Sequence, residues 1–459
     1  MSIANDSALA ERYQAQAYAS IVFSFSHPDR LAAIARLHGL EAADPQTARV
    51  LEIGCASGLN LLSIAACFPS AELLGIDLDG VAIQKACQRQ KSLGLENIRF
   101  EQSDLLEWDS DGLEFDYIIA HGFFSWVPDS VKEQLLVRIQ QCLAPNGVAL
   151  ISYLTQPGSM GREAARDFLA LHTSGNKSPH KVMERAREAA HFLSALTSSR
   201  NPPGNPLAPV ADYLLRKNPD VLFHDELGPI YDPCYFLQFM EWAGEHGLQF
   251  LSEARLVDHA PEIFPEAARR LLDDSPIDRL RLEQYRDYAA NRSFRRSLLC
   301  PAAARLSPVP DASAVKGFSL SLNVRLSFEM LDLSEGVSMR FETPSGVVLT
   351  TSEPVAKAAY CLLSEIKTVS VSFQELLRRV TATLDSLSLP NTEDTAKQLS
   401  NALLLGAYRG LLDLSLDGSL SSGQPLSDDH PFSRLQALLA EEGLPALDTW
   451  RRQMRRTNP

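Results

Sequence analysis

The chain has 459 residues, of which 45% are hydrophobic and 22% charged, and its formal net charge is −14. This length is typical of about two or three domains, and the composition supplies each with an apolar core, so wholesale disorder is excluded. The negative charge disfavours a nucleic-acid partner, because an acidic surface repels the phosphate backbone.

The seven cysteines are odd in number, scattered, and never form a CxxC pair. Such usage is typical of a reducing compartment and predicts neither a disulfide framework nor a metal site. No apolar run approaches the roughly 18 residues of a membrane span. The amino terminus has no basic region followed by an apolar one. We therefore expect a cytoplasmic protein without membrane insertion.

Residues 1–47 predict an aromatic lead-in and a cap helix. Ser26-His27-Pro28-Asp29 has the pattern of a helix start with a proline in the first turn, and it predicts a helix over Leu31–Leu40. We interpret His27 as a residue of this helix start rather than as a base.

Between residues 48 and 155, short apolar runs alternate with helical patterns. Strands are expected at Val50–Ile53, Ala71–Asp77, Asn97–Asp104, Phe115–His121 and Val148–Leu154, and helices at Leu59–Phe68, Gly80–Leu93 and Ser130–Leu143. Strands separated by helices of about 10 to 15 residues predict an α/β fold, a parallel sheet with helices on both faces.

Beyond Leu154 this alternation stops, and residues 156–228 predict a helical insertion. Its most regular apolar stripe runs from Val182 to Leu196 at helical spacing. Such a stripe needs a partner, either the parent domain or a second subunit, so residues 160–197 are a candidate homodimer surface. Residues 229–302 predict a return to the sheet, with a helix at Tyr235–Glu245 and strands at Leu248–Leu256 and Phe294–Cys300.

A linker is expected over 301–313, followed by a C-terminal domain over 314–459. Strand-like stretches at 317–329 and 338–350 precede helices that begin at Ser352-Glu353-Pro354, at the capping box Ser372…Glu375, and at Leu399. Three helices mixed with short strands favour an α+β domain of winged-helix type, which we expect to regulate the protein or to bind its substrate.

The most informative stretch is the glycine loop at residues 51–60, Leu-Glu-Ile-Gly-Cys-Ala-Ser-Gly-Leu-Asn. It follows a buried strand and opens a helix, the context in which a glycine pattern indicates nucleotide binding. Gly54 and Gly58 allow the backbone to approach a ligand closely. Glu52 would repel a phosphate but attract a cation such as an α-ammonium group.

Acidic residues also end the next two predicted strands. Asp77 lies where an acid accepts hydrogen bonds from ribose hydroxyls, and Asp104 lies where it can bond an adenine amino group. An ammonium group, a ribose and an adenine together describe S-adenosylmethionine. A nicotinamide dinucleotide is the alternative, disfavoured by Glu52 and by the G-x-A-x-G spacing; an ordinary tight turn is the structural alternative. The expected cofactor-binding residues are Glu52, Gly54, Cys55, Ala56, Gly58, Asn60, Asp77, Leu78, Ser103, Asp104, Leu105, His121 and Gly122.

The fourth predicted strand ends in Ala-His-Gly-Phe-Phe-Ser-Trp at residues 120–126, at the edge where such sheets bind ligands. This is not the Asn/Asp-Pro-Pro-Tyr motif that grips exocyclic amines of bases. His121 is a candidate base for a nucleophile that is protonated in solution, because such a nucleophile must lose its proton before attack. The site candidates also have structural interpretations: Tyr13 and Tyr18 on a helix surface, His121 at a strand end, Phe123 and Trp126 in core or lid packing, and His224 in a solvated loop. The candidate substrate-binding residues are Tyr13, Tyr18, Phe123, Trp126 and His224.

Three arginines near the end of the predicted return to the sheet, Arg292, Arg295 and Arg296, are expected to form a solvated face. No group of His and carboxylate residues has the spacing of metal ligands.

With these motifs the sequence resembles class I S-adenosylmethionine-dependent methyltransferases, and more narrowly the bacterial subfamily that has a methyltransferase regulatory domain. The resemblance covers most of residues 1–300 and, more loosely, the C-terminal domain. It departs from the family where Gln14-Ala15-Gln16-Ala17 replace the usual acids between two tyrosines and where Ala56 replaces a glycine. The matching segments are Tyr13, Tyr18, 25–31, 51–60, 120–128, 224–227, 235–239 and 291–295.

The subfamily includes rickettsial lysine methyltransferases that modify outer-membrane proteins. The resemblance therefore implies a Rossmann-like methyltransferase sheet, S-adenosylmethionine as cofactor, and N-methylation of lysine side chains of a protein. Because a lysine must lose its proton before attack, the resemblance makes His121 the candidate base and Tyr18 a candidate catalytic residue. Two alternatives stay open, a small-molecule acceptor and a cofactor-binding regulatory protein without catalysis.

Overall fold

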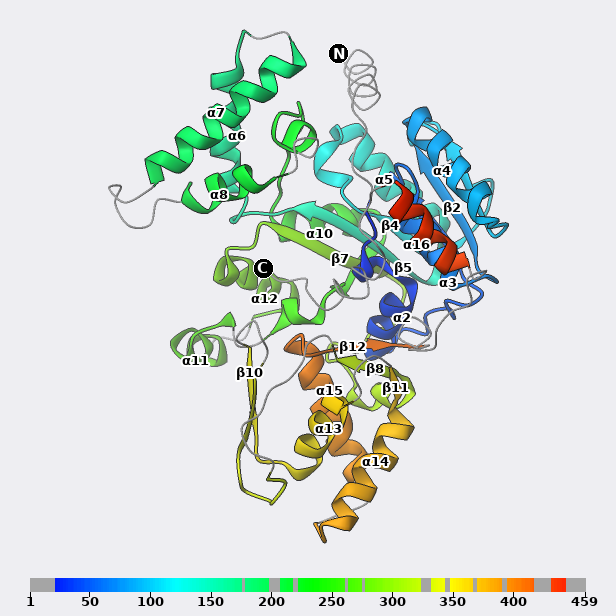
Figure 1. The fold of residues 1–459 in the computed structure, drawn as a ribbon, viewed down its shortest axis with the longest axis vertical. Helices are drawn as coiled ribbons and strands as arrows, with labels where there is room; N and C mark the ends of the chain where they lie inside the picture. Colours follow the sequence, from blue (N-terminus) through cyan, green and yellow to red (C-terminus); the bar gives the residue numbers. More distant parts are fainter. Residues whose placement is uncertain are drawn as a thin grey trace.

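The structure is a computed structural model that describes residues 21–175, 178–197, 207–217, 222–260, 263–274, 277–322, 332–342, 347–365, 370–389, 394–416 and 431–442. Tyr13 and Tyr18 lie outside the described residues. A seven-stranded sheet with helices on both faces forms the centre of the chain (Figure 1). Within the described residues, no helix has both the length and the apolar character needed to cross a membrane.

The sheet has the strand order β3-β2-β1-β4-β5-β7-β6. Strands β1 to β5 are parallel, as predicted, whereas β7 is antiparallel to both β5 and β6. The order reverses at β1, which pairs with β2 on one side and β4 on the other, and ligands bind at the carboxyl ends of strands at such a point. The strands are β1 (Arg49–Ile53), β2 (Glu72–Asp77), β3 (Ile98–Gln102), β4 (Phe115–Ala120), β5 (Leu143–Leu154), β6 (Leu248–Glu253) and β7 (Phe294–Pro301).

Successive residues of the central strands enter two different cores, one on each face of the sheet. Val50 of β1 joins the first core and Leu51 the second, because side chains alternate along a strand. Both faces are covered by helices, which explains why the strands are almost continuously apolar. The helices around the sheet are α2 (Pro28–Leu37), α3 (Leu59–Cys67), α4 (Gly80–Leu93), α5 (Asp129–Cys142), α10 (Phe236–Glu245), α11 (Glu266–Asp274) and α12 (Arg279–Ala290), with short turns η1 (Ser24–Ser26), η2 (Phe124–Trp126) and η4 (Leu256–His259).

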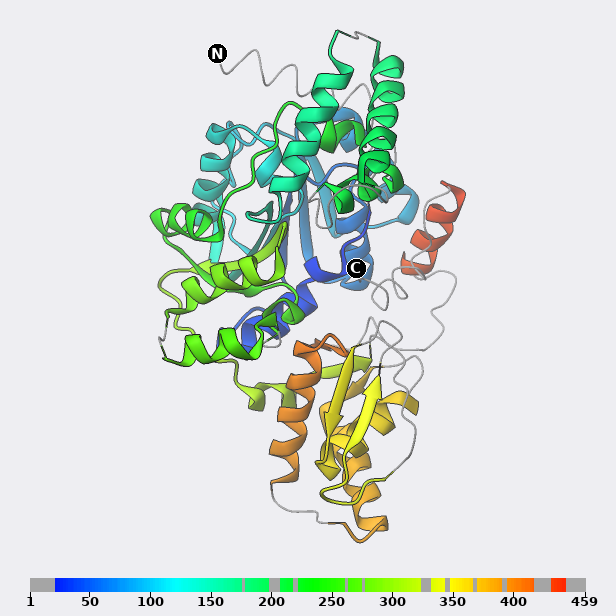
Figure 2. The ribbon, with the colours of Figure 1, turned by 90° about the vertical axis from the view of Figure 1, so that its left-hand side faces the viewer.

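The helical insertion stands to one side of the sheet (Figures 1 and 2). It contains α6 (Met160–Thr173), α7 (Pro179–Thr197), α8 (Ala208–Arg216) and the short π-helix η3 (Leu222–Glu226). The middle of the predicted apolar stripe of α7, from Ala186 to Leu193, packs on α6 and α8, so its partner lies within the insertion, whereas Leu196 at the end of the stripe is 45% exposed. The buried residues of this cluster include Leu169, Ala186, Ala189, Leu193 and Leu214.

The C-terminal unit is α+β, as expected, and the winged-helix interpretation stays a prediction. A three-stranded antiparallel sheet has the order β11-β8-β12, and β9 pairs with β10 in a separate hairpin. The elements are η6 (Ala312–Gly317), β8 (Ser319–Leu322), β9 (Met339–Glu342), β10 (Val348–Thr351), α13 (Pro354–Glu365), β11 (Val371–Ser372), α14 (Phe373–Ser386), α15 (Thr395–Tyr408), β12 (Leu412–Ser415) and α16 (Pro431–Glu441).

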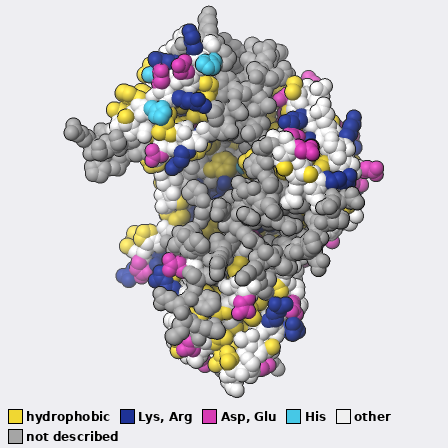
Figure 3. Space-filling model, in the orientation of Figure 1, with side chains coloured by type: hydrophobic (Ala, Val, Ile, Leu, Met, Phe, Trp, Pro, Cys, Tyr) yellow, Lys and Arg dark blue, Asp and Glu magenta, His cyan; other side chains and the backbone are white. Residues whose placement is uncertain are grey.

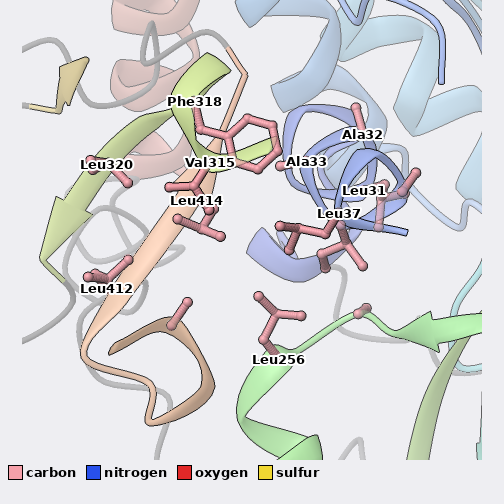
Figure 4. Close-up of a cluster of buried hydrophobic side chains, with 14 of the residues drawn as sticks. Leu31, Ala32, Ala33, Leu37, Leu256, Val315, Phe318, Leu320, Leu412 and Leu414 are labelled. Carbon is pink, nitrogen blue, oxygen red and sulfur yellow. The ribbon is translucent and has the colours of Figure 1, made fainter. Parts of the chain in front are cut away.

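Helix α2 joins the two units. Leu31 and Leu37 pack with Phe318 and Leu414 of the C-terminal unit in one cluster (Figure 4). Asp29 accepts a hydrogen bond from the backbone N–H of Leu416 at 2.7 Å, which ties the start of α2 to the end of β12. The cap helix predicted from Ser26-His27-Pro28-Asp29 is therefore present, and it also anchors the C-terminal unit.

Candidate active site

The glycine loop between β1 and α3 has a backbone that only small residues can adopt. Gly54 and Gly58 both have φ of +75°, and Ala56 has φ of +46°. A Cβ at Gly54 would lie 2.7 Å from the Phe123 ring, and one at Gly58 would lie 2.6 Å from Phe100. Positive φ and lack of space therefore both require glycine at these positions.

Hydrogen bonds to the Asp77 carboxylate connect this loop to the end of β2. One carboxylate oxygen accepts a hydrogen bond from the backbone N–H of Ala56 at 2.7 Å, and the other accepts from Asp79 at 2.9 Å. Burial raises the pKa of the Asp77 carboxyl, while these backbone hydrogen bonds oppose that shift. Each oxygen retains a second lone pair, which is what a ribose hydroxyl needs.

Glu52 is buried at the end of β1 beside Asn60. The Asn60 amide donates to Glu52 Oε1 at 2.7 Å, and its own oxygen accepts from the Phe23 backbone N–H at 3.0 Å. Glu52 Oε2 is buried, and the described residues supply it with no hydrogen-bond partner. Burial raises the pKa of Glu52 to about 8. An orphaned buried carboxylate oxygen fits an arriving cationic group, because that group would supply the missing partner.

The end of β3 continues the same edge of the sheet. The Ser103 backbone N–H donates to the Asp77 carbonyl at 2.9 Å, and Asp104 accepts from the Leu106 N–H at 2.9 Å. Leu105, which lies between Asp104 and Leu106, is buried. Ser103, Asp104 and Leu105 therefore lie beside the end of β2, where the sequence predicted the adenine contacts.

His121, directly after β4, lies in an aromatic enclosure. Its ring is 4.0 Å from Phe23, 4.9 Å from Phe25 and 5.9 Å from Phe294, measured between centroids. The Arg296 guanidinium lies over Phe25 at 4.8 Å and over Phe294 at 4.9 Å. Burial, and then the charge of Arg296, lower the pKa of His121 to about 3, so the ring is neutral. His121 Nδ1 is buried and has no hydrogen-bond partner among the described residues.

The phenylalanines and Arg296 of this enclosure were missed as site residues. They come from the lead-in to α2 and from β7, whose approach to His121 depends on the tertiary fold. The resemblance segments 25–31 and 291–295 did include Phe25 and Phe294, but no local pattern indicated that they meet His121.

The remaining candidates for substrate contact lie in different surroundings. Phe123 packs on the glycine loop at Gly54. Trp126 lies 5.8 Å from the Tyr231 ring, with the Arg162 guanidinium 5.5 Å from its own ring, so it contacts the base of the insertion. His224 lies in the short π-helix η3.

Gly122, a predicted cofactor residue, lies in the turn after β4. Its backbone N–H donates to the Ser152 hydroxyl at 2.8 Å, which holds this turn in place.

The prediction of a solvated arginine face is wrong. Arg295 is fully buried and forms ion pairs with Glu253 at 2.6 Å, with Asp287 at 2.8 Å and with Glu283 at 3.3 Å. The Arg292 side chain is only 10% exposed. The reason is that α12 lies against Arg292 and Arg295, because its Glu283 and Asp287 form the ion pairs with these arginines.

Two protein families match segments of this chain. Residues 25–195 match the family described as a methyltransferase domain, and residues 218–301 match a predicted methyltransferase regulatory domain. Uncharacterized protein RP789 of Rickettsia prowazekii is 28% identical over 425 residues, covering 91% of this chain and 75% of the relative. Uncharacterized protein RP028 of the same organism is 31% identical over 240 residues, covering 52% of this chain and 96% of the relative.

Among solved structures, PKMT2 from Rickettsia typhi in complex with AdoHcy has a TM-score of 0.78 and 26% identity. The alignment covers 92% of this chain and 82% of that chain. AdoHcy is what S-adenosylmethionine becomes once its methyl group has been transferred.

The sheet order, the match to the methyltransferase domain and the similarity to a structure in complex with AdoHcy define a Rossmann-like methyltransferase that uses S-adenosylmethionine. The chain belongs to the methyltransferase family whose members carry a methyltransferase regulatory domain.

Proposed function

We propose that this methyltransferase N-methylates lysine side chains of a protein substrate. The observation that carries the proposal is the enclosure around His121, where a neutral imidazole with an unpartnered Nδ1 lies among three phenylalanine rings beside a guanidinium. The edge of the sheet at which it lies is the edge that carries the cofactor residues.

For the cofactor, we assign roles to residues along this edge of the sheet. The Glu52 carboxylate would hold the α-ammonium group, Asp77 the ribose hydroxyls, and Asp104 the adenine amino group. Gly54 and Gly58 keep the loop backbone in the left-handed conformation and allow Phe123 and Phe100 to pack directly against it. When bound, S-adenosylmethionine supplies an electrophilic methyl group.

The enclosure favours the reactive form of a lysine side chain. An ammonium group has an ordinary pKa of about 10.4 and cannot attack while protonated. Desolvation among aromatic rings and the nearby charge of Arg296 both disfavour a second cation, so they favour the neutral amine. The same two causes lower the pKa of His121.

His121 then orients the amine rather than storing its proton. A histidine with a pKa of about 3 is a weak base, but its unpartnered Nδ1 can accept a hydrogen bond from an amine N–H. This bond would aim the nitrogen lone pair, and such alignment is the main contribution an enzyme makes to methyl transfer. The net charge of −14 suits a basic polypeptide as partner.

The experiment is incubation of the enzyme with cell lysate and S-adenosylmethionine labelled in its methyl group. We expect label on polypeptide and, after acid hydrolysis, in methylated lysine. The variant His121→Ala should label about tenfold more slowly at saturating S-adenosylmethionine, the value of one buried hydrogen bond. Label on small molecules would replace the proposal with the small-molecule alternative. Absence of label, with AdoHcy binding intact, would favour a non-catalytic regulatory protein.

A further inference from the structure

The C-terminal helix α16 lies apart from the rest of its unit and packs on the methyltransferase core. It contacts α3, which begins directly after the glycine loop, and α4 (Figure 1). Its Leu435 and Leu439 are buried in the same core cluster as Ala86 of α4. Two buried leucines against this surface indicate a specific docking contact.

At the end of α16, Glu442 forms an ion pair with Arg89, and Arg89 also contacts the glycine loop. Glu442 accepts from Arg89 Nε at 3.0 Å and also from Arg89 Nη2, and it lies 3.3 Å from Lys85. Arg89 is buried on α4, with 4% of its side chain exposed. The remaining nitrogen, Nη1, donates to the Ser57 carbonyl at 2.8 Å and to the Ser57 hydroxyl at 2.7 Å.

Ser57 is part of the glycine loop itself, between Ala56 and Gly58. Fixing its carbonyl fixes the plane of the peptide between Ser57 and Gly58, whose N–H donates to the Cys55 carbonyl at 3.0 Å. A single guanidinium thus links the C-terminal helix to the loop backbone that approaches the cofactor.

We propose that Arg89 is a positioning residue for cofactor binding and that Glu442 of α16 holds it in place, so the C-terminal segment sets the affinity of the enzyme for S-adenosylmethionine. Without Glu442, Arg89 loses the carboxylate that engages two of its three nitrogens and can turn away from Ser57. The loop then samples more conformations and must be ordered by the ligand, which weakens binding.

The test is calorimetry with AdoHcy on full-length variants. We expect Glu442→Gln to raise the Kd by about three- to tenfold, which corresponds to roughly 1 kcal/mol. Glu441→Gln is the matched control, because it removes the same charge from the neighbouring exposed residue, and we expect wild-type affinity. Glu442→Asp keeps the charge and should recover part of the loss.

Two further measurements separate positioning from general stability. Hydrogen exchange of the amides of residues 55–59 should be faster in Glu442→Gln, while the thermal unfolding midpoint changes little. In an Arg89→Lys background, Glu442→Gln should have a smaller effect than in the wild type, as a double-mutant cycle requires of residues that act together. Unchanged AdoHcy affinity in Glu442→Gln, or an equal loss in Glu441→Gln, would overturn the proposal. No methyl acceptor is needed, so this outcome is independent of the lysine proposal.

Discussion

At the scale of single residues, Glu52 combines burial with an unfilled hydrogen-bonding position. Burial raises its pKa to about 8, well above the ordinary value of 4.5. The cofactor-free protein therefore holds Glu52 protonated at neutral pH. A folded state that retains this proton loses stability as the pH rises from about 4.5 toward 8, because the unfolded chain releases the proton first.

Binding of a cation to Glu52 should therefore release a proton. We expect the AdoHcy Kd to fall as the pH rises from about 6 toward 8, by at most about tenfold per pH unit. Calorimetry in two buffers of different ionisation enthalpy measures the released proton directly. The variant Glu52→Gln should bind more weakly with no such pH dependence. Wild-type binding without proton release below pH 7.5 would show that Glu52 is not the group that meets the ammonium.

Residue by residue, local patterns indicated the proposed cofactor loop more fully than the proposed acceptor site. Gly54, Gly58, Glu52 and Asp77 belong to one strand-loop-helix unit and the strand after it, where position along the chain dictates position in space. The enclosure of His121 gathers rings from both ends of the core, so only the tertiary fold reveals it.

At the scale of elements, the ion network around Arg295 joins β7 to β6 and α12. Its guanidinium contacts Glu253 on β6 and both Glu283 and Asp287 on α12. Replacing Arg295 with Met should lower the free energy of unfolding by about 3–5 kcal/mol, because three buried carboxylates lose their counter-charge. Chemical denaturation measures this, with Arg281→Met on the exposed side of α12 as control. A loss under about 1 kcal/mol would mean that water compensates these carboxylates.

The helical insertion still presents apolar side chains after its own stripe is packed. Phe192 is 52% exposed and Leu196, one turn later on α7, is 45% exposed; Leu171 on α6 is 72% exposed. Hydrophobic side chains are visible on this part of the surface in Figure 3. Exposed apolar groups of this kind favour an interface with a second copy of the chain.

Dimerisation through this insertion remains a prediction. Light scattering at micromolar concentration should give about twice the 50.5 kDa of one chain. Phe192→Glu should shift the protein toward monomer, because a charge would be buried in the interface. Leu271→Glu on α11, where the leucine is 70% exposed, is the control and should leave the dimer intact. A monomeric wild type would exclude the interface.

At the scale of the whole molecule, the fold class followed from alternation along residues 48–155, since buried parallel strands are short apolar runs separated by helices. Helix α4 has the predicted bounds, Gly80–Leu93, because Asp79 caps its start and Gly94 ends it with positive φ. The insertion of β7 between β5 and β6 could not be predicted, because strand pairing depends on segments far apart in the chain.

The packing of α16 on the core could not be predicted for the same reason. Glu442 and Arg89 are 353 residues apart, and neither residue has a sequence pattern that indicates the other. The molecule is therefore a methyltransferase core whose cofactor edge is contacted by segments from both ends of the chain, Phe23 at Asn60 and Glu442 at Arg89.

The most direct test of the cofactor assignment is calorimetric titration of the wild type and Asp77→Ala with AdoHcy. We predict one binding site per chain, and an affinity at least about tenfold weaker in Asp77→Ala. The Asp77 carboxylate holds the loop at Ala56, and we propose that it also binds the ribose. Glu114→Ala removes one exposed acid at the opposite edge of the sheet and should bind as the wild type does. Absence of binding by the wild type, or equal affinity in Asp77→Ala, would contradict the account.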